Sequence, residues 1–283
     1  MIVHGGAWDV PAELAEPCRQ GARRALDRGW KILAAGGTAI DACEAAIVEL
    51  EEDPVFDAGI GSHLNQDGKA QLDAILMDGV TLKSGAVASV EKIRNPIRLA
   101  RIIMEQCDEM LLSGYGAEAF ARGVGHPLCD PAIFRIASEL ERWKTSSAQM
   151  GTVGAAALDV HGNLAAGTST GGTPFKLPGR IGDSPLVGCG CYADNEGAAV
   201  SSTGHGESVM KIVMAKYVSD LVASGQTAQA AADAAIALLG RRTTGKAGLI
   251  SLDRQGRVGA AFSTGNLVRA FRTSSRPEPV VIV

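Results

Sequence analysis

The sequence predicts an α+β fold in which helices cover layered, mostly antiparallel sheets. The first half of the 283 residues alternates helical and strand patterns, whereas the second half gives strand pairs, then helices, then strand pairs again. Short turns at 159–163 and 253–256 join neighbouring strand patterns, as in antiparallel hairpins. Because 46% of the residues are hydrophobic, the chain can bury a substantial core, as one large domain or two small ones.

The first half predicts a short strand, two long helices, two strands and three further helical segments. Apolar residues recur at three- and four-residue steps over 11–35, and two glycines stop that helix. Thr38 is of a residue type that caps helix N-termini. In order, the expected elements are a strand ending at residues 4–6, helices over 11–35 and 38–50, strands near 70–77 and 85–90, and helical segments beginning near Pro96, Gly116 and Pro131.

The second half begins with residues 142–150, which are polar and show no periodicity. We therefore expect an exposed linker there. The expected elements beyond it are strands over 152–158, 164–169 and 197–202, helices over 207–223 and 228–239, and strands over 247–252 and 258–262.

Composition argues against several classes of protein. The net charge is -4 and the Lys and Arg residues are scattered, so no basic surface for nucleic acid is expected. No apolar run reaches the roughly 18 residues of a membrane span, and no secretion signal opens the sequence. The six cysteines form no CxxC pair, so we interpret them as reduced thiols of a cytoplasmic protein. The five histidines lack metal-ligand spacing, which argues against a catalytic metal.

The segment Gly151-Thr152-Val153-Gly154, directly after the polar linker, contains the candidate nucleophile. A threonine hydroxyl attacks only when a base adjoins it, and the threonine's own freed amino group can be that base. The sequence therefore predicts a cut between Gly151 and Thr152 that leaves fragments 1–151 and 152–283. For this motif taken alone, an ordinary strand threonine is the alternative interpretation.

Arg180 and Asp183 form the candidate substrate-binding pair. They lie three residues apart in a loop bounded by prolines, so a helix-surface ion pair does not explain them. A guanidinium group grips a carboxylate in two places, and a carboxylate binds an ammonium group. Together they suit the α-carboxylate and α-amine of an amino acid, with a surface salt bridge as the alternative.

In order and spacing, these and other segments resemble the plant-type (type 2) asparaginase and isoaspartyl peptidase family of N-terminal-nucleophile hydrolases. The resemblance runs through nearly the whole chain. Its motifs are IVHGGA (2–7), DPVFDAGIGS (53–62), LDAILMDG (72–79), GAVA (85–88), RNP (94–96), GTVG (151–154), TSTGG (168–172), PGRIGDSP (178–185), GLI (248–250) and STG (263–265).

The resemblance implies a single domain over residues 1–283, built as a four-layer αββα sandwich and cut into fragments 1–151 and 152–283. It implies self-processing, followed by hydrolysis of L-asparagine and of β-aspartyl (isoaspartyl) dipeptides through an acyl-enzyme. It also implies a dimer of cut protomers, each containing both fragments.

The resemblance assigns roles to individual residues. Thr170 orients the nucleophile, and Thr203 with the Gly204 N–H forms the oxyanion hole. Arg180 and Asp183 hold the α-groups of the substrate, which Gly204 and Gly206 also touch. At one position the chain departs from the family pattern: Asp57 stands where many members carry asparagine, which places a carboxyl group near the site.

The loop from Leu50 to Ile60 resembles one that binds a structural sodium ion through main-chain carbonyls in some relatives. Carbonyl oxygens suit such a hard cation. No cofactor is expected for catalysis. The residues expected to bind sodium are Leu50, Glu51, Asp53, Phe56, Ala58 and Ile60.

Two other functions stay open at this point. Glycosylasparaginase uses the same nucleophile, and Phe175-Lys176 is similar to that branch, whereas the amino-terminal HGGA motif and the LPGR motif at 177–180 favour asparaginase. A small-molecule binder that keeps the pocket but never processes itself belongs to a different class. A phosphate-binding loop is not expected, because no GxxxxGK[ST] motif occurs.

Overall fold

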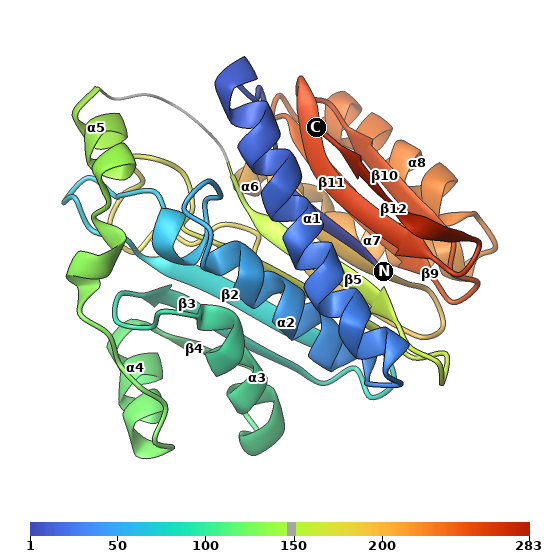
Figure 1. The fold of residues 1–283 in the computed structure, drawn as a ribbon, viewed down its shortest axis with the longest axis horizontal. Coiled ribbons are helices and arrows are strands. Elements are labelled where there is room, and N and C mark those ends of the chain that lie inside the picture. The colour runs from blue at the N-terminus through green and yellow to red at the C-terminus, as the bar shows by residue number, and fades with distance from the viewer. Residues whose placement is uncertain (146–150) are drawn as a thin grey trace.

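Two β-sheets flanked by helices make up the computed structural model, which describes residues 1–145 and 151–283 (Figure 1). The larger sheet has eight strands, and all its neighbours pair antiparallel except β3 and β4. Across the sheet the strands are β12 (Arg276–Ile282), β11 (Asn266–Thr273), β1 (Ile2–Trp8), β5 (Val153–Leu158), β6 (Leu164–Thr170), β2 (Leu72–Asp78), β3 (Ser84–Val90) and β4 (Leu111–Ser113).

The smaller sheet has four antiparallel strands and lies against the larger one. Across it the strands are β10 (Val258–Phe262), β9 (Ala247–Asp253), β8 (Ala198–Gly204) and β7 (Cys191–Ala193). Strands β5 and β6 of the larger sheet contact β8 of the smaller one. The sheets approach closely at Gly154, where a Cβ would lie 1.9 Å from the Ser201 hydroxyl oxygen.

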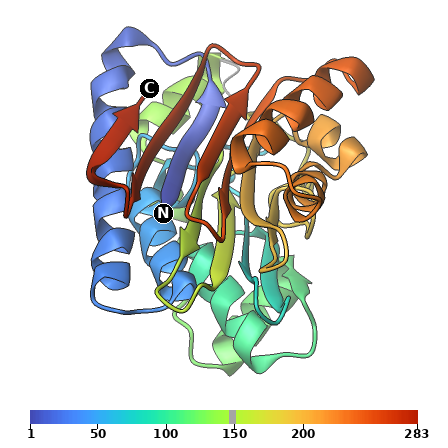
Figure 2. The same ribbon diagram turned by 90° about the vertical axis from the view of Figure 1, so that its right-hand side faces the viewer.

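Helices cover the outer side of each sheet. Helices α1 (Ala12–Ala34), α2 (Ala39–Glu51) and α3 (Pro96–Gln106) pack on the larger sheet, and α7 (Met214–Ala223) and α8 (Ala228–Arg242) pack on the smaller one. Figure 2 shows the blue helices α1 and α2 on one side of the strands and the orange helices on the other. The remaining helical segments are α4 (Gly114–Gly123), α5 (Ala137–Thr145), α6 (Gly206–Ile212), η1 (Gly59–Gly61) and η2 (Pro131–Phe134).

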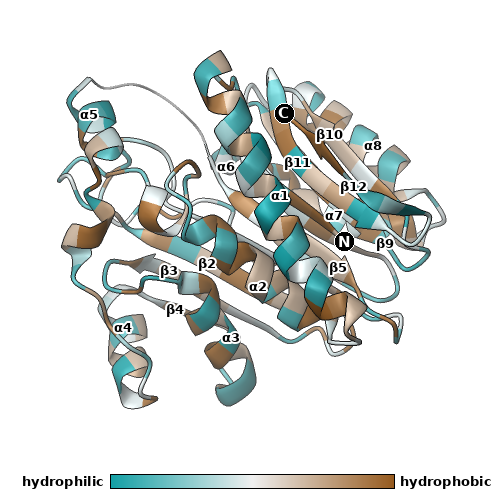
Figure 3. Cartoon of the chain, in the orientation of Figure 1, coloured by the Kyte–Doolittle hydropathy of each residue, from teal (hydrophilic) through white to brown (hydrophobic). Residues whose placement is uncertain are grey.

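The core follows from the amphipathic pattern of these elements. Helix α1 buries Cys18, Ala22 and Leu26, while hydrophilic residues line much of its viewer-facing side (Figure 3). Strands β5 and β6 are buried almost throughout, because helices cover one face of the larger sheet and the smaller sheet covers the other. Within the described part of the chain, no helix has both the length and the apolar character needed to cross a membrane.

Several local expectations are confirmed. The long helices α1 and α2 lie where periodicity placed them, and the Thr38 side chain accepts a hydrogen bond from the Asp41 N–H as an N-cap. The hairpin of β5 and β6 turns at residues 159–163. The carboxylate of Asp159 accepts hydrogen bonds from two N–H groups of that turn, which explains its sharp reversal.

Other expectations were wrong. Strand β1 continues through Gly5 and Gly6 to Trp8, because it stays paired with β11 across an irregularity between His4 and Ala7. The helix expected over 207–223 breaks at Val213, whose φ of 49° is left-handed. The helical segment expected near Pro131 does begin there, but as the short 3-10 helix η2, and α5 follows it.

Residues 142–145 continue helix α5, so the start of the expected linker is helical. Residues 146–150 of that linker lie outside the described residues. Strands β4, β7, β11 and β12 were not predicted.

Candidate active site

Thr152 directly precedes the central strand β5, and its side chain is buried. The hydroxyl oxygen Oγ1 lies 2.5 Å from the carbonyl oxygen of Gly151 and 3.2 Å from the Thr170 hydroxyl oxygen. The predicted nucleophile therefore lies against the carbonyl group of the peptide bond that the sequence predicts to be cut.

Thr170 ends β6, the strand next to β5, so that its hydroxyl meets the Thr152 junction. Its Oγ1 accepts a hydrogen bond from the Gly172 N–H at 2.8 Å. It lies within donating distance of the Gly151 carbonyl oxygen, at 3.1 Å, and of an Asp57 carboxyl oxygen, at 3.3 Å. The Thr170 hydroxyl can thus polarise the Gly151 carbonyl while it contacts the Thr152 hydroxyl.

Asp57 lies beneath this junction and is 5% exposed. Burial raises the pKa of its carboxyl group to about 6, although a hydrogen bond from the His63 N–H favours the charged form. A Cβ on Gly151 would lie 2.5 Å from the Asp57 Cβ. The space beside Asp57 therefore requires glycine at position 151.

Arg180 and Asp183 meet at Gly206 but do not pair with each other. A Cβ on Gly206 would lie 2.9 Å from both the Arg180 Nη2 and the Asp183 Oδ1. The guanidinium group of Arg180 donates two hydrogen bonds of 2.9 Å to Glu207. Asp183 is buried, so the alternative of a surface salt bridge between the two was wrong.

The buried carboxyl group of Asp183 can bind a cation. Its Oδ2 is buried and has no hydrogen-bond partner within residues 1–145 and 151–283. Burial raises the pKa of Asp183 to about 7. A ligand ammonium group would satisfy the orphaned oxygen and favour the charged carboxylate.

Thr203 and Gly204 end strand β8. Residues of β1 lie between them and Thr152. The Thr203 hydroxyl accepts a hydrogen bond from the Ala7 N–H at 3.3 Å. A Cβ on the preceding residue, Gly6, would lie 3.4 Å from the Thr152 carbonyl oxygen. Gly204 has a φ of 130°, which favours glycine, and helix α6 begins two residues later at Gly206.

Sequence reasoning missed two charged residues of this region. Lys176 is 4% exposed and donates to the Gln71 carbonyl oxygen at 2.6 Å. Burial lowers the pKa of its amino group, against the attraction of the Asp73 and Asp57 carboxylates. Glu207 pairs with Arg180. Neither spacing nor composition marks a lysine as buried, and Glu207 looked like an ordinary first-turn residue of a helix.

The loop expected to bind sodium contains several closely spaced main-chain carbonyl groups. A Cβ on Gly59 would lie 2.1 Å from the Glu51 carbonyl oxygen, and a Cβ on Gly61 would lie 2.1 Å from that of Phe56. Main-chain oxygens therefore crowd the inside of the loop. The Phe56 and Ala58 carbonyls accept one backbone hydrogen bond each, which leaves a second lone pair for a cation. These two carbonyl groups have the oxygen chemistry that such an ion requires.

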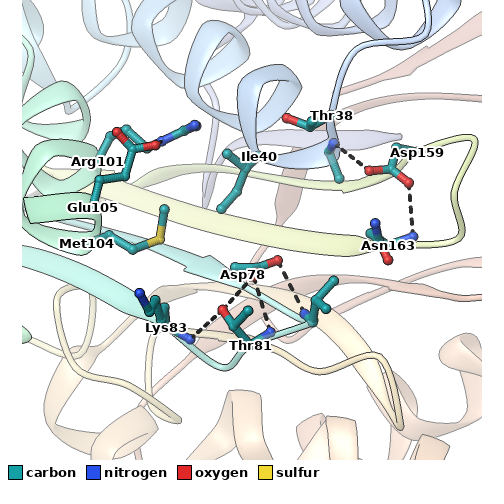
Figure 4. Close-up of a pocket in the computed structure, with 12 residues that line it drawn as sticks. Thr38, Ile40, Asp78, Thr81, Lys83, Arg101, Met104, Glu105, Asp159 and Asn163 are labelled. Atoms are coloured by element: carbon teal, nitrogen blue, oxygen red, sulfur yellow. Dashed lines mark hydrogen bonds and ion pairs between the residues drawn. The ribbon is translucent and has the colours of Figure 1, made fainter.

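A cavity of about 490 Å³ lies elsewhere, beside the N-terminus of α2 (Figure 4). Its polar side chains serve local structure: Asp159 accepts from the Ala39 N–H, and Asp78 accepts from the Thr81 N–H and hydroxyl. It contains none of the residues expected to catalyse or bind substrate. Although this cavity is large, the region around Thr152 is the better candidate for the active site, because the expected catalytic side chains lie there.

Known proteins are similar to this chain along nearly its whole length. A family model described as asparaginase matches residues 1–149 and 144–282. The isoaspartyl peptidase/L-asparaginase of Danio rerio is 42% identical over 275 residues, covering 93% of this chain and 89% of the relative. The Homo sapiens protein of the same name is 42% identical over 289 residues, covering 98% and 91%. The plant-type L-asparaginase of Pyrococcus abyssi is 42% identical over 304 residues, covering 99% and 98%.

Proposed function

The chain belongs to the asparaginase family, and from this premise we propose that it hydrolyses L-asparagine and β-aspartyl dipeptides with Thr152 as an amino-terminal nucleophile. The family and the relatives' names make it a hydrolase, which leaves no support for the non-processing binder. The observation that carries the role of Thr152 is the contact of its hydroxyl with the Gly151 carbonyl and the Thr170 hydroxyl.

The first reaction is self-cleavage. The Thr152 hydroxyl oxygen attacks the Gly151 carbonyl carbon, while the Thr170 hydroxyl donates to the carbonyl oxygen. The C–N bond then breaks, the nitrogen takes up the proton that the Thr152 hydroxyl gives up and becomes the amine of Thr152, and Gly151 is held as an ester on the Thr152 hydroxyl oxygen. Hydrolysis of the ester releases fragment 1–151 and a fragment that begins with Thr152.

The second reaction uses the new amino group as the base. The Thr152 amine accepts the hydroxyl proton as its oxygen attacks the side-chain carbonyl of asparagine, and it returns the proton to the leaving ammonia. For a β-aspartyl dipeptide, the leaving group is the amine of the second residue. Thr203 and the Gly204 N–H stabilise the oxyanion, and water hydrolyses the aspartyl ester to release L-aspartate.

Substrate recognition is assigned to Arg180 and Asp183. The guanidinium group binds the α-carboxylate while Glu207 fixes its orientation through two hydrogen bonds. The orphaned Asp183 carboxyl oxygen accepts the α-ammonium group. Gly206 has no side chain that would separate the two charges.

The proposal is tested by following the mass of the freshly made chain. The wild type should yield two fragments, one of which begins at Thr152. Thr152→Ala should stay whole and lack asparaginase activity, because it removes the attacking oxygen. Thr145→Ala, on the exposed end of α5, is the matched control and should process normally. An active wild type that stays whole would contradict the role of Thr152.

Glycosylasparaginase is the second candidate. Phe175 stacks on Trp143, with ring centroids 6.3 Å apart, and such an aromatic surface suits a sugar face. The names of the relatives favour asparagine and isoaspartyl peptides. Rates measured in parallel on asparagine, a β-aspartyl dipeptide and a glycosylated asparagine will separate the two activities.

The wider organisation is proposed on the same premise. The helix-covered sheets are assigned to the four-layer αββα sandwich, in which the fragments form one domain and two cut protomers form a dimer. A sodium ion held by carbonyls of the 50–60 loop would stiffen the loop that bears Asp57. The six free thiols support a reducing compartment such as the cytoplasm.

A further inference from the structure

A second, much smaller cavity lies beside Gly151. Its volume is about 10 Å³, close to the smallest space that holds one water molecule. Gly151 lines it together with the buried side chains of Asp57, His63 and Glu139, and with Arg142. A space of the size of one water molecule, lined in part by titratable side chains, therefore adjoins Gly151, the residue at which self-cleavage is proposed.

His63 presents an unused nitrogen in this cavity. Its side chain is 4% exposed, and its Nδ1 lies 2.8 Å from a carboxyl oxygen of Glu139. Its Nε2 has no hydrogen-bond partner in the described ranges on either side of residues 146–150. Asp57 Oδ2 lies 3.9 Å from that Nε2, too far for a direct hydrogen bond. One water molecule can bridge such a gap.

The surrounding charges decide which nitrogen of His63 carries the proton. Glu139 only accepts at Nδ1, so it requires an N–H there, whereas an Arg142 nitrogen lies farther away, at 3.3 Å. Arg142 also pairs with Glu139. The shorter contact to Glu139 selects Nδ1–H and leaves a basic lone pair on Nε2.

We propose that His63 positions and deprotonates the water that hydrolyses the Gly151–Thr152 ester, with Glu139 as its positioning residue. This rests on the proposed self-cleavage. The water oxygen bonds to the Gly151 carbonyl carbon, and its proton moves to Nε2 of His63. The bond between that carbon and the Thr152 hydroxyl oxygen breaks, and the proton passes from His63 to this oxygen. The products are the Gly151 carboxylic acid and Thr152 with a free amine.

The test separates ester formation from ester hydrolysis. Chains are made by cell-free synthesis, and cleavage is followed on denaturing gels with and without neutral hydroxylamine, which attacks esters but spares ordinary peptide bonds. His63→Gln should process at least about 10-fold more slowly, since a general base contributes roughly 100-fold or more. Hydroxylamine should restore its cleavage and leave a hydroxamate on Gly151.

Two further variants complete the design. Glu139→Gln should show a smaller delay with the same rescue, because it keeps the side-chain volume but no longer fixes the Nδ1–H form. If His63→Gln does not fold, the Glu139→Gln variant still tests the proposal. His161→Gln, in the exposed hairpin turn, is the matched control and should behave as wild type.

Normal processing by His63→Gln, or slow processing that hydroxylamine does not restore, overturns the role of His63. Cleavage of Thr152→Ala would instead overturn the proposed nucleophile, so the two failures differ.

Discussion

At the scale of single residues, the candidate site has two parts. One part contains the hydroxyl groups of Thr152 and Thr170, and the other contains the charged side chains of Arg180 and Asp183. In the proposed mechanism, Thr152 and Thr170 act at a buried junction that the Asp57 carboxyl group adjoins. Arg180 and Asp183 would hold a substrate with both an α-carboxylate and an α-ammonium group, so their ionisation would control binding. The buried Asp183 carboxylate is costly until an ammonium group compensates it, which couples substrate affinity to pH.

We predict that substrate binding weakens as the pH falls through about 7. Below that pH the free enzyme protonates Asp183, whose pKa burial raises to about 7, and a neutral acid does not pair with the substrate ammonium. The KM for asparagine should rise on the acidic side. Asp183→Asn should lower kcat/KM by roughly 100-fold, as expected when one partner of a buried charge pair is removed.

The free energy of unfolding should depend on the ionisation of Asp183 in the opposite direction to substrate binding: the Asp183 contribution should fall as the pH rises. A carboxyl group with a raised folded-state pKa favours the folded state most at low pH, and it loses this contribution as the pH rises from about 4 to about 7. Thermal unfolding of Asp183→Asn should therefore improve relative to wild type at pH 8 more than at pH 5. The exposed α1 variant Asp27→Asn is the control. A pH-independent difference for Asp183→Asn would contradict the buried carboxylate.

The sequence could predict site residues that stand in short motifs, but not those whose contacts join distant positions of the chain. Thr152, Arg180 and Asp183 stand in short motifs with a direct chemical interpretation, and the structure brings Thr170 to the first and Gly206 to the others. His63 lies in a loop, and no motif of the sequence marks it. Its burial against Glu139, 76 positions away, depends on tertiary packing that no local pattern encodes.

At the scale of elements, local patterns predicted the long helices and the β5–β6 hairpin, but not the edge strands β4, β7 and β12 or the inner strand β11. Strand β12 contains Pro277 and Pro279, which usually argue against a strand but are tolerated at a sheet edge. Strands β4 and β7 have three residues each, too few for an alternating pattern. The break after α6 requires left-handed backbone at Val213, a residue type that gives no such signal.

The contact between β5 and β8 gives a prediction about Gly154. An alanine Cβ there would lie 1.9 Å from the Ser201 hydroxyl oxygen and 2.6 Å from the His4 Nε2, both buried. Gly154→Ala should therefore cost about 3 kcal/mol of unfolding free energy, in the range of overpacked cores. Gly116→Ala, on an open position of helix α4, should instead gain about 0.5–1 kcal/mol. Equal effects in urea unfolding would contradict the close approach.

At the scale of the whole molecule, the order of strands determines what the proposed self-cleavage would do to the fold. Fragment 1–151 supplies β1, β2, β3 and β4, whereas fragment 152–283 supplies the other four strands of the larger sheet. Strand β1 lies between β11 and β5, and β6 pairs with β2. Each fragment therefore contributes inner strands whose backbone hydrogen bonds are completed by the other.

We predict that the cut fragments stay together in native buffer and separate only on unfolding. Separation would expose strand edges of β1, β5, β6 and β2 along with the buried apolar residues between them, and such edges are not stable in water. After complete processing, size-exclusion chromatography should give one peak that contains both fragments in equal amounts, and denaturant should split it in a single cooperative transition. Fragment 152–283 made alone should fail to fold, because β5 and β6 would lack β1 and β2. A stable, soluble fragment made alone, or two native peaks from the processed protein, would contradict the interleaved sheet.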